Sequence, residues 1–247
     1  MKQLKEKIKN LLNNSQIDEA VVTDIMHKNS AMPFTVEARL LTYLLSIGTI
    51  SYEDYVSIVD EYTQRNIEEN KYLYLFDMAP RTFGQTWGEQ HIKKLFPKFV
   101  NATKQNLEKI YPSFDGEFDL WIDNIRVEVK ACRANSTSTI GGLRERAYSH
   151  IEAQTANFKY HYQQLKPSCC DVFIWIGVCK DELLYWVLTS QELLHTGKLG
   201  PQHRNENTGN EAASVFEGQV FMTEEELQSF QVNETEILEK VKEKGKQ

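Results

Sequence analysis

The sequence predicts an α/β (α+β) fold in which helices flank a mixed β-sheet, preceded by an N-terminal helical region. Three observations support this fold class. Residues 1 to 80 carry apolar side chains at helical spacing, residues 118 to 130 alternate as a short β-hairpin does, and DVFIWIGVC followed by ELLYWVLT is typical of a buried strand pair. These segments divide the 247-residue chain into an N-terminal region, a core at 81 to 222 and a helical tail at 223 to 247.

In the N-terminal region we expect helices that pack or dimerise. VEARLLTYLLSIG forms the most apolar helix and ends at Gly48, after which Ser51 caps SYEDYVSIVDEYTQRN. A further helix is expected around residues 18 to 26. The two later helices have a helix-turn-helix outline, but the second one carries acids that DNA phosphates would repel, at Glu53, Asp54, Asp60 and Glu61. Packing or dimerisation is therefore favoured, and DNA reading stays open as the alternative.

The most informative stretch is YPSFDGEFDLWIDNIRVEVKAC, which predicts strands at 118 to 122 and 125 to 130 around an Asp123-Asn124 turn. This turn sets Ile122 opposite Ile125, Leu120 opposite Val127 and Asp119 opposite Glu128. Alternation along the strands then gives two faces. The core face holds Phe118, Leu120, Ile122, Ile125, Val127 and Val129, and the other face holds Asp119, Glu128 and Lys130.

Two carboxylates directly opposite each other on a hairpin repel unless a cation lies between them. Asp119 and Glu128 offer only oxygen ligands, and a site with few protein oxygens suits Mg²⁺, which keeps waters and shares its shell with substrate phosphates. The alternative is an exposed hairpin whose outer face is simply charged. The metal site is the sharper hypothesis because the spacing D-x8-E-x-K accompanies an apolar inner face.

This pattern resembles the active-site hairpin of the PD-(D/E)XK nuclease superfamily, the fold of most type II restriction endonucleases. The resemblance implies that Asp119 and Glu128 are metal ligands and that Lys130 positions or activates the attacking water. The family often places a proline just before the first acid, where this chain has Phe118. Either Asp115 or Glu117 could therefore take the place of Asp119.

The helix expected before the hairpin, within TFGQTWGEQHIKKLFPKFV, carries a further candidate acid. Ile92, Leu95, Phe96 and Phe99 recur at helical spacing and would dock on a sheet. Glu89 lies at the border of this apolar face, where an acid usually needs a partner. It is either a capping or surface glutamate or, as the resemblance implies, an accessory catalytic acid.

Two polar segments are candidates for DNA contact. The first follows Lys130, and the second is the long loop at 196 to 213. The candidate contacts are Arg133, Asn135, Ser136, Arg144 and Arg146 in the first segment and His203, Arg204 and Asn205 in the second. Arginine and amide side chains read base edges well. The alternative for both segments is a solvent-exposed loop that binds no ligand.

The remaining core elements complete a restriction-endonuclease-like order. SHIEAQTANFKYHYQQL predicts a helix that Pro167 ends, and it is followed by the buried strand pair. Together with the helix at Glu89 and the hairpin, this gives a mixed sheet in the αβββαβ order of the nuclease core, over residues 82 to 190. VFEGQVFM predicts one more strand, and the tail from residue 223 is expected to be a solvated helical cap.

Composition limits the partners. The net charge of −7 argues against a protein that coats nucleic acid, yet residues 81 to 168 carry a net charge of +4 around the hairpin. The sequence has no apolar run of about 20 residues and begins without a secretory signal, so we expect a cytoplasmic protein with no membrane association. The four cysteines lack paired spacing, so neither zinc nor disulfides are expected.

The function expected from these features is that of a type II restriction endonuclease. Such an enzyme would hydrolyse double-stranded DNA at a short sequence with Mg²⁺ as cofactor and would leave 5′-phosphates. A homodimer is expected if the target is palindromic. The alternatives are a repair or recombination nuclease of the same superfamily and a non-catalytic DNA-binding module. The sequence contains no GxxxxGK[ST] loop, so energy-driven translocation is not expected.

Overall fold

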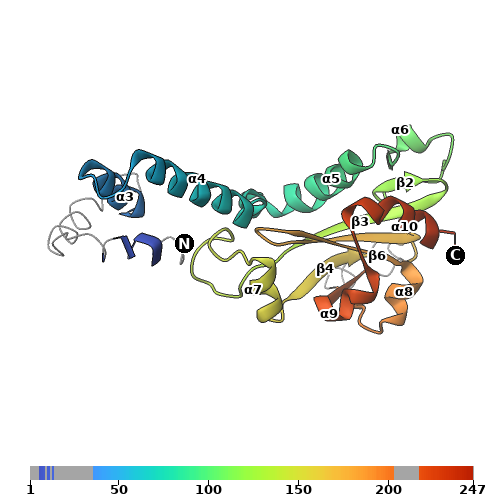
Figure 1. Ribbon diagram of the computed structural model, residues 1–247. Coiled ribbons are helices and arrows are strands. Elements are labelled where there is room, and N and C mark those ends of the chain that lie inside the picture. The colour runs from blue at the N-terminus through green and yellow to red at the C-terminus, as the bar shows by residue number, and fades with distance from the viewer. Residues whose placement is uncertain (1–5, 9, 12, 14–35, 203–216, 247) are drawn as a thin grey trace. The chain divides into compact units, whose positions relative to one another are not determined.

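The computed structural model describes residues 6–8, 10–11, 13, 36–202 and 217–246. The chain forms two compact units, Met1–Glu68 and Glu69–Gln247, so the boundary falls before the expected one at residue 80. The fold is mixed α/β and contains a mixed sheet of six strands together with helices (Figure 1). Within the described ranges, no helix is long and apolar enough to cross a membrane.

The N-terminal unit contains the two helices expected after residue 35, α3 (Val36–Ser46) and α4 (Tyr52–Glu69). Gly48 has φ 71°, a left-handed conformation that ends the first helix. Ser51 caps the second helix as predicted, because its Oγ accepts a hydrogen bond of 3.0 Å from the Asp54 N–H. The apolar core of this unit includes Leu40, Leu41, Leu44, Ile50 and Ile58. The helix expected around residues 18 to 26 lies outside the described residues.

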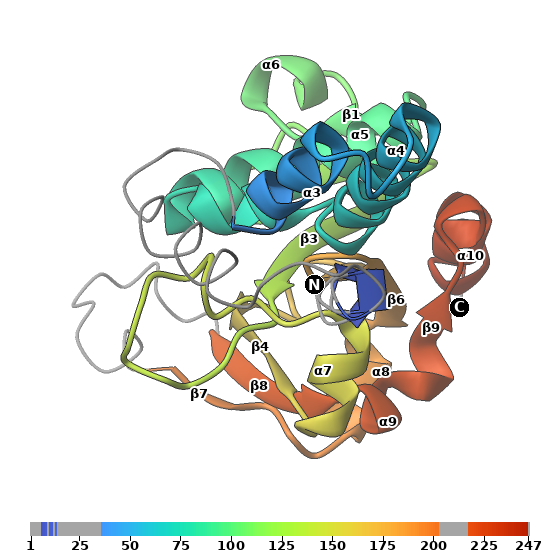
Figure 2. The ribbon, with the colours of Figure 1, turned by 60° about the vertical axis from the view of Figure 1, so that its left-hand side comes forward.

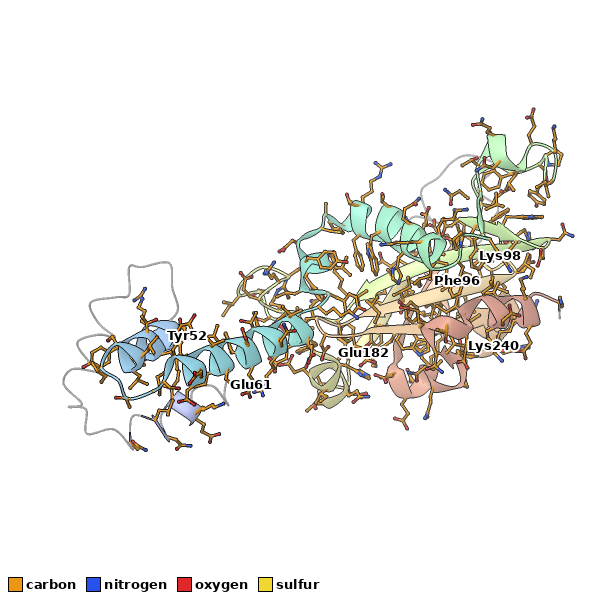
Figure 3. The ribbon with its side chains drawn as sticks, turned by 45° about the horizontal axis from the view of Figure 1, so that its top comes forward. Tyr52, Glu61, Phe96, Lys98, Glu182 and Lys240 are labelled. Atoms are coloured by element: carbon orange, nitrogen blue, oxygen red, sulfur yellow. The ribbon has the colours of Figure 1, made fainter. Side chains whose placement is uncertain are left out.

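The acids predicted on α4 are exposed to solvent. Tyr52 at the start of α4 and Glu61 further along it are labelled in Figure 3. The Glu61 carboxylate accepts hydrogen bonds of 3.0 Å from Lys7 and from Arg65. These exposed ion pairs contribute little stability, and they leave α4 with an acidic surface.

The larger unit is built on the six-stranded sheet in the order β1-β2-β3-β5-β6-β9. Its strands are β1 (Val100–Asn101), β2 (Leu120–Ile122), β3 (Ile125–Arg133), β5 (Val172–Val178), β6 (Leu183–Thr189) and β9 (Gln231–Val232). β3 and β5 are parallel and the other neighbours are antiparallel. Every residue of β5 is buried, as its unbroken apolar sequence predicted.

Helices cover one face of this sheet. The chain enters through a 3-10 turn, η1 (Leu73–Asp77), and a π-helical turn, η2 (Thr82–Trp87), which continues into α5 (Gly88–Leu95). α10 (Ile237–Lys244) covers the same face, and Ile237, Leu238 and Val241 are buried in the same core as Ile92 of α5 (Figure 1). The expectation of a solvated C-terminal cap is therefore wrong, because α10 has an apolar stripe that packs on the sheet.

A second, three-stranded sheet covers the opposite face. Its order is β4-β8-β7, with bounds β4 (Lys159–Leu165), β8 (Gly218–Thr223) and β7 (Gly200–Pro201) (Figure 2). Tyr160 and Tyr162 of β4 pack on the buried indoles of Trp186 and Trp175, with ring centroids 5.0 and 4.4 Å apart. The short helices α6 (Lys104–Leu107), α7 (His150–Thr155), α8 (Ser190–His195) and α9 (Glu224–Leu227) connect the strands.

β4 corrects the prediction of one helix up to Pro167. The capped helix α7 ends at Thr155, and Asn157 then takes a left-handed conformation with φ 48°. From Lys159 onward the chain is a strand, because the tyrosines alternate with polar residues at a period of two. The helix-like spacing of Ile151, Phe158 and Tyr162 concealed this alternation.

Candidate active site

The β2–β3 hairpin has the register that the sequence predicted. Leu120 pairs with Val127 and Ile122 pairs with Ile125. Asp123 and Asn124 form the turn with φ values of 48° and 67°, which both residue types tolerate. The strand prediction was wrong at Phe118 and Asp119, because β2 starts only at Leu120. Phe118 instead packs on Phe114 and Trp121 in the core on the opposite face.

Asp119 lies just before the start of β2, where the edge of β3 is no longer covered by that strand. Its backbone N–H donates to the carbonyl of Val127 at 3.1 Å, and its Oδ2 accepts from the N–H of Val129 at 2.8 Å. The carboxylate thus accepts the hydrogen bond that a backbone carbonyl of a longer β2 strand would accept. Because N–H and C=O of one strand residue point to the same side, the Val129 carbonyl faces this open edge too.

A cleft of about 1020 Å³ follows the open edge of β3. All four side chains predicted to be catalytic line it, namely Glu89, Asp119, Glu128 and Lys130. The rest of the lining comprises Pro80, Arg81, Gly84, Gly116, Glu117, Val129, Ala131, His161, Tyr162, Gln163, Gln164 and Lys166. The cleft therefore has one wall from β3 and α5 and a second wall from β4.

Helix α5 brings Glu89 to this edge because it lies close against β3. A β-carbon at Gly88 would lie 3.6 Å from Ala131 and 3.7 Å from Val129, so the helix backbone touches the strand. His91, on the same helix, stacks between Trp87 and Tyr185 and shares a hydrogen bond of 2.7 Å with the Tyr185 hydroxyl. His91 thus has a structural role, and it holds the helix that carries Glu89.

The acids of the cleft have raised pKa values because they are buried and close to one another. Burial, with repulsion by Asp119 and Glu128, raises the pKa of Glu89 to about 8. Burial also raises the pKa of Asp119 and of Glu128, although the positive charge of Lys130 acts against both shifts. Ionisation of these three carboxyl groups is therefore unfavourable in the metal-free cleft. A bound cation would favour their ionised forms.

Lys130 extends from the same strand and forms an ion pair with Glu128, with Nζ 2.5 Å from Oε1. Burial lowers the pKa of this lysine, but attraction to Glu128 and Asp119 outweighs that effect and raises it. The ammonium group therefore stays protonated at neutral pH. It can donate hydrogen bonds and stabilise negative charge, and it is a poor proton acceptor.

The donor set fits a hard divalent cation. Asp119, Glu128 and the Val129 carbonyl offer oxygen atoms at one edge, and repulsion between the carboxyl groups favours a positive ion there. Within the part of the chain that the structure describes, no three His, Cys, Asp or Glu side chains form a cluster that could hold a metal. A cation here would thus depend on water and substrate oxygens for the rest of its shell, as Mg²⁺ commonly does.

The two alternatives to Asp119 lie differently. Asp115 is exposed and forms an ion pair of 3.0 Å with Lys104, and it does not line the cleft. Glu117 lines the cleft, and its Oε2 accepts a hydrogen bond of 2.9 Å from the Asp115 N–H. Asp119 lines the cleft together with Glu128 and Lys130, and its Oδ2 accepts the hydrogen bond from the Val129 N–H, so the geometry favours it as the first acid.

The candidate DNA contacts that follow Lys130 lie at the end of β3, at Arg133, and in the folded loop after it. Arg133 donates to the carbonyls of Leu75 and Met78 at 3.1 and 2.8 Å and lies over the Phe83 ring, so its guanidinium is used within the fold. Arg146 bonds carbonyls of the loop itself, including that of Gly142 at 3.3 Å.

Three further candidates of this loop are placed by the structure. Asn135 forms a β-bridge with Ala147, and the N–H of Ser136 donates to the Arg146 carbonyl at 2.9 Å. Arg144 forms an exposed ion pair with Asp77. Of the arginines, Arg144 is the one best placed to exchange its partner for a phosphate. His203, Arg204 and Asn205 lie outside the described residues.

Sequence reasoning assigned no role to the β4 wall. His161, Gln163, Gln164 and Lys166 all line the cleft opposite the acids. The signal that could have found them is the alternation of KYHYQQL, which places its tyrosines on one face and polar residues on the other. Comparisons of the chain with protein-family models, with curated proteins and with solved structures found no match.

Proposed function

We propose that the chain is a Mg²⁺-dependent endodeoxyribonuclease of the restriction type, acting on double-stranded DNA. The observation that carries the proposal is the convergence of Asp119, Glu128, Lys130 and Glu89 on one cleft at the open edge of β3. Charge supports it too, because the acids of this cleft favour a bound cation over the empty state.

The order of elements around the cleft also supports the proposal. Helix α5 is followed by the antiparallel β1-β2-β3 meander, and β3 is then joined by the parallel strand β5. The order expected of a restriction-endonuclease-like core is αβββαβ; the observed order is in keeping with it up to β3, whereas β4 takes up much of the second expected helix. The hairpin spacing D-x8-E-x-K is the second feature in common.

The reaction is the hydrolysis of a phosphodiester bond. A water oxygen attacks phosphorus in line with the 3′ oxygen and loses one proton to solvent. The bond from phosphorus to the 3′ oxygen breaks, and that oxygen gains a proton, so the products are a 5′-phosphate and a 3′-hydroxyl. Bound Mg²⁺ would lower the pKa of water and stabilise the charge on the phosphoryl group in the transition state.

The protein residues have separate roles in this proposal. Asp119 and Glu128 would hold the cation, with Glu89 as an accessory acid at the same edge. Lys130, protonated because of its raised pKa, would donate a hydrogen bond to the attacking water and hold it in line with phosphorus. A homodimer would let two such clefts act on the two strands of a palindromic site.

The proposal also places the protein in the cytoplasm. In the described ranges Cys132, Cys169, Cys170 and Cys179 are free thiols, which suits a reducing compartment.

Digestion of linear DNA of known sequence with Mg²⁺ tests the function. We expect discrete fragments that carry 5′-phosphates and that disappear when Mg²⁺ is chelated. Cleavage only at junctions, flaps or damaged bases would indicate a repair or recombination nuclease instead. Binding without cleavage under all divalent cations would indicate a non-catalytic DNA-binding module.

A further inference from the structure

Strand β4 is distorted at the point where it borders the cleft. Tyr162 and Leu165 are both buried, with two residues between them, and the pairing of β4 with β8 shifts register there. Gln164 takes φ 57°, a left-handed conformation that costs free energy for a residue other than glycine. Its N–H donates to the side-chain carbonyl of Gln202 at 2.7 Å, which holds the bulge. Bulges of this kind re-aim side chains, commonly next to active sites.

The residue re-aimed beyond the bulge is Lys166. The next turn anchors its backbone, because its carbonyl accepts a hydrogen bond of 2.9 Å from the Cys169 N–H. Its side chain is half-buried and lines the same cleft as Glu89, Asp119 and Glu128. Within the ranges that the structure describes, its ammonium has no hydrogen bond or ion pair.

The two lysines of the cleft therefore differ. Lys130 is bound to Glu128 at 2.5 Å and is neutralised in place. Lys166 has no partner among the described residues, yet it is near enough to both Asp119 and Glu128 for its charge to lower the pKa of each carboxyl group. A half-buried ammonium without a counter-ion in a solvent-filled cleft is available to an anionic ligand.

We propose that Lys166 binds a backbone phosphate of the DNA at the point of cleavage, from the wall opposite the acids. This inference rests on the proposed nuclease function and adds a substrate contact to it. An acidic cleft repels DNA, so a second, unneutralised cation gives the substrate phosphate a position and stabilises the charge that builds up during attack. The bulge at Gln164 is the positioning element that aims the lysine.

The test compares Lys166→Gln and Lys166→Arg with a matched control, Lys159→Gln. Lys159 is exposed at the start of β4, the strand that precedes Lys166, and does not line the cleft. Cleavage of duplex DNA with Mg²⁺ gives kcat and KM. DNA binding with Ca²⁺ in place of Mg²⁺, measured across KCl concentrations, gives the salt slope. Thermal unfolding shows that each variant is folded.

For Lys166→Gln we expect kcat to fall by about 10²-fold, the typical cost of losing one transition-state contact. The slope of log K against log salt should fall by about 0.9, which corresponds to one lost phosphate contact. Lys166→Arg should keep the slope and recover part of kcat because it keeps the charge. Lys159→Gln should leave kcat unchanged.

The outcomes separate the two proposals. If the wild type cleaves and Lys166→Gln matches it in kcat and salt slope, the inference is overturned and the nuclease function stands. If the wild type binds DNA without cleaving it and Lys166→Gln still loses salt slope, the phosphate contact stands and the nuclease function falls. If the wild type neither binds nor cleaves DNA, both are overturned.

Discussion

The two walls of the cleft have opposite electrostatic characters. The wall formed by β3, α5 and the segment just before β2 presents four carboxyl groups and one lysine that is already paired. The lining residues of β4 include no acid, and Lys166, directly after β4, forms no ion pair within the described residues. The first wall suits a cation. The second wall suits an anion, such as a phosphate that also binds the cation. A cleft with acids on both walls would repel DNA, so the difference between the walls supports the proposed anionic substrate.

The largest expected effect comes from the acidic wall, by the substitution Asp119→Asn. We expect DNA cleavage to fall by at least about 10³-fold, since a ligand for the cation is lost. The fold should survive, because an asparagine oxygen can still accept the hydrogen bond from the Val129 N–H. Single-turnover cleavage measures the loss, and thermal unfolding in EDTA should show equal or higher stability because repulsion at Glu128 is relieved.

The matched control for this substitution is Asp115→Asn, the same chemical change at an exposed residue outside the cleft. It should cleave DNA like the wild type. An equal loss of DNA cleavage in Asp119→Asn and Asp115→Asn would show that the acidic wall is not the site of the reaction.

The next effect concerns pH and Glu89. Its pKa is raised from the ordinary value to about 8, so the stability it contributes is complete below about pH 4.5 and is lost as pH rises through 8. Metal-free protein should therefore unfold at lower temperature at pH 8 than at pH 5, and a loss of about 1 kcal/mol would lower Tm by about 2–4 °C. Glu89→Gln should reduce this slope, and Mg²⁺ should reduce it in the wild type.

Thermal unfolding at several pH values in EDTA checks this dependence, with Glu108→Gln at an exposed position as control. If Glu89→Gln leaves the pH dependence of Tm unchanged, Glu89 does not have the raised pKa assigned to it.

A smaller effect is expected in the β4 wall, where Gln164→Val should lower the free energy of unfolding by about 1–2 kcal/mol because a β-branched residue resists φ > 0. Gln164→Asn should be nearly neutral, since asparagine tolerates this conformation. Urea unfolding measures both variants. Gln163→Val, next to it in ordinary strand conformation, is the control, and an equal loss there would argue against strain at the bulge.

The smallest effect is expected outside both walls, at the exposed ion pair of Arg144 with Asp77. Arg144→Ala should change the free energy of unfolding by less than about 0.5 kcal/mol. If Arg144 contacts DNA, the salt slope of binding should fall by about 0.9. Asp77→Ala, which frees the arginine, should keep that slope, so equal slopes in all three proteins would remove Arg144 from the DNA contacts.

The acidic wall was largely predictable from sequence because its signals are local. A two-residue Asp-Asn turn sets the register, and the register alone sets Asp119 beside Glu128. The helical spacing around Ile92 likewise placed Glu89 near the sheet. The exact start of β2 was not predictable, because it depends on Phe118 finding aromatic partners on the other face.

The β4 wall could not be predicted with the same reasoning. The strand β4 follows the short helix α7 after three residues. Its tyrosines fit the apolar stripe of a helix as well as the alternation of a strand. What decides for the strand is tertiary, namely the two indoles of β5 and β6 on which Tyr162 and Tyr160 pack. The bulge that aims Lys166 depends on Gln202, which is remote in sequence.

The most direct test of the proposed nuclease is single-turnover cleavage of supercoiled plasmid by the wild type, Asp119→Asn and Asp115→Asn, each with Mg²⁺ and with EDTA. We predict cleavage by the wild type and by Asp115→Asn with Mg²⁺ only, and none above background by Asp119→Asn. Cleavage by Asp119→Asn at the wild-type rate, or wild-type cleavage that persists in EDTA, would contradict the assignment of this cleft as a metal-dependent nuclease site.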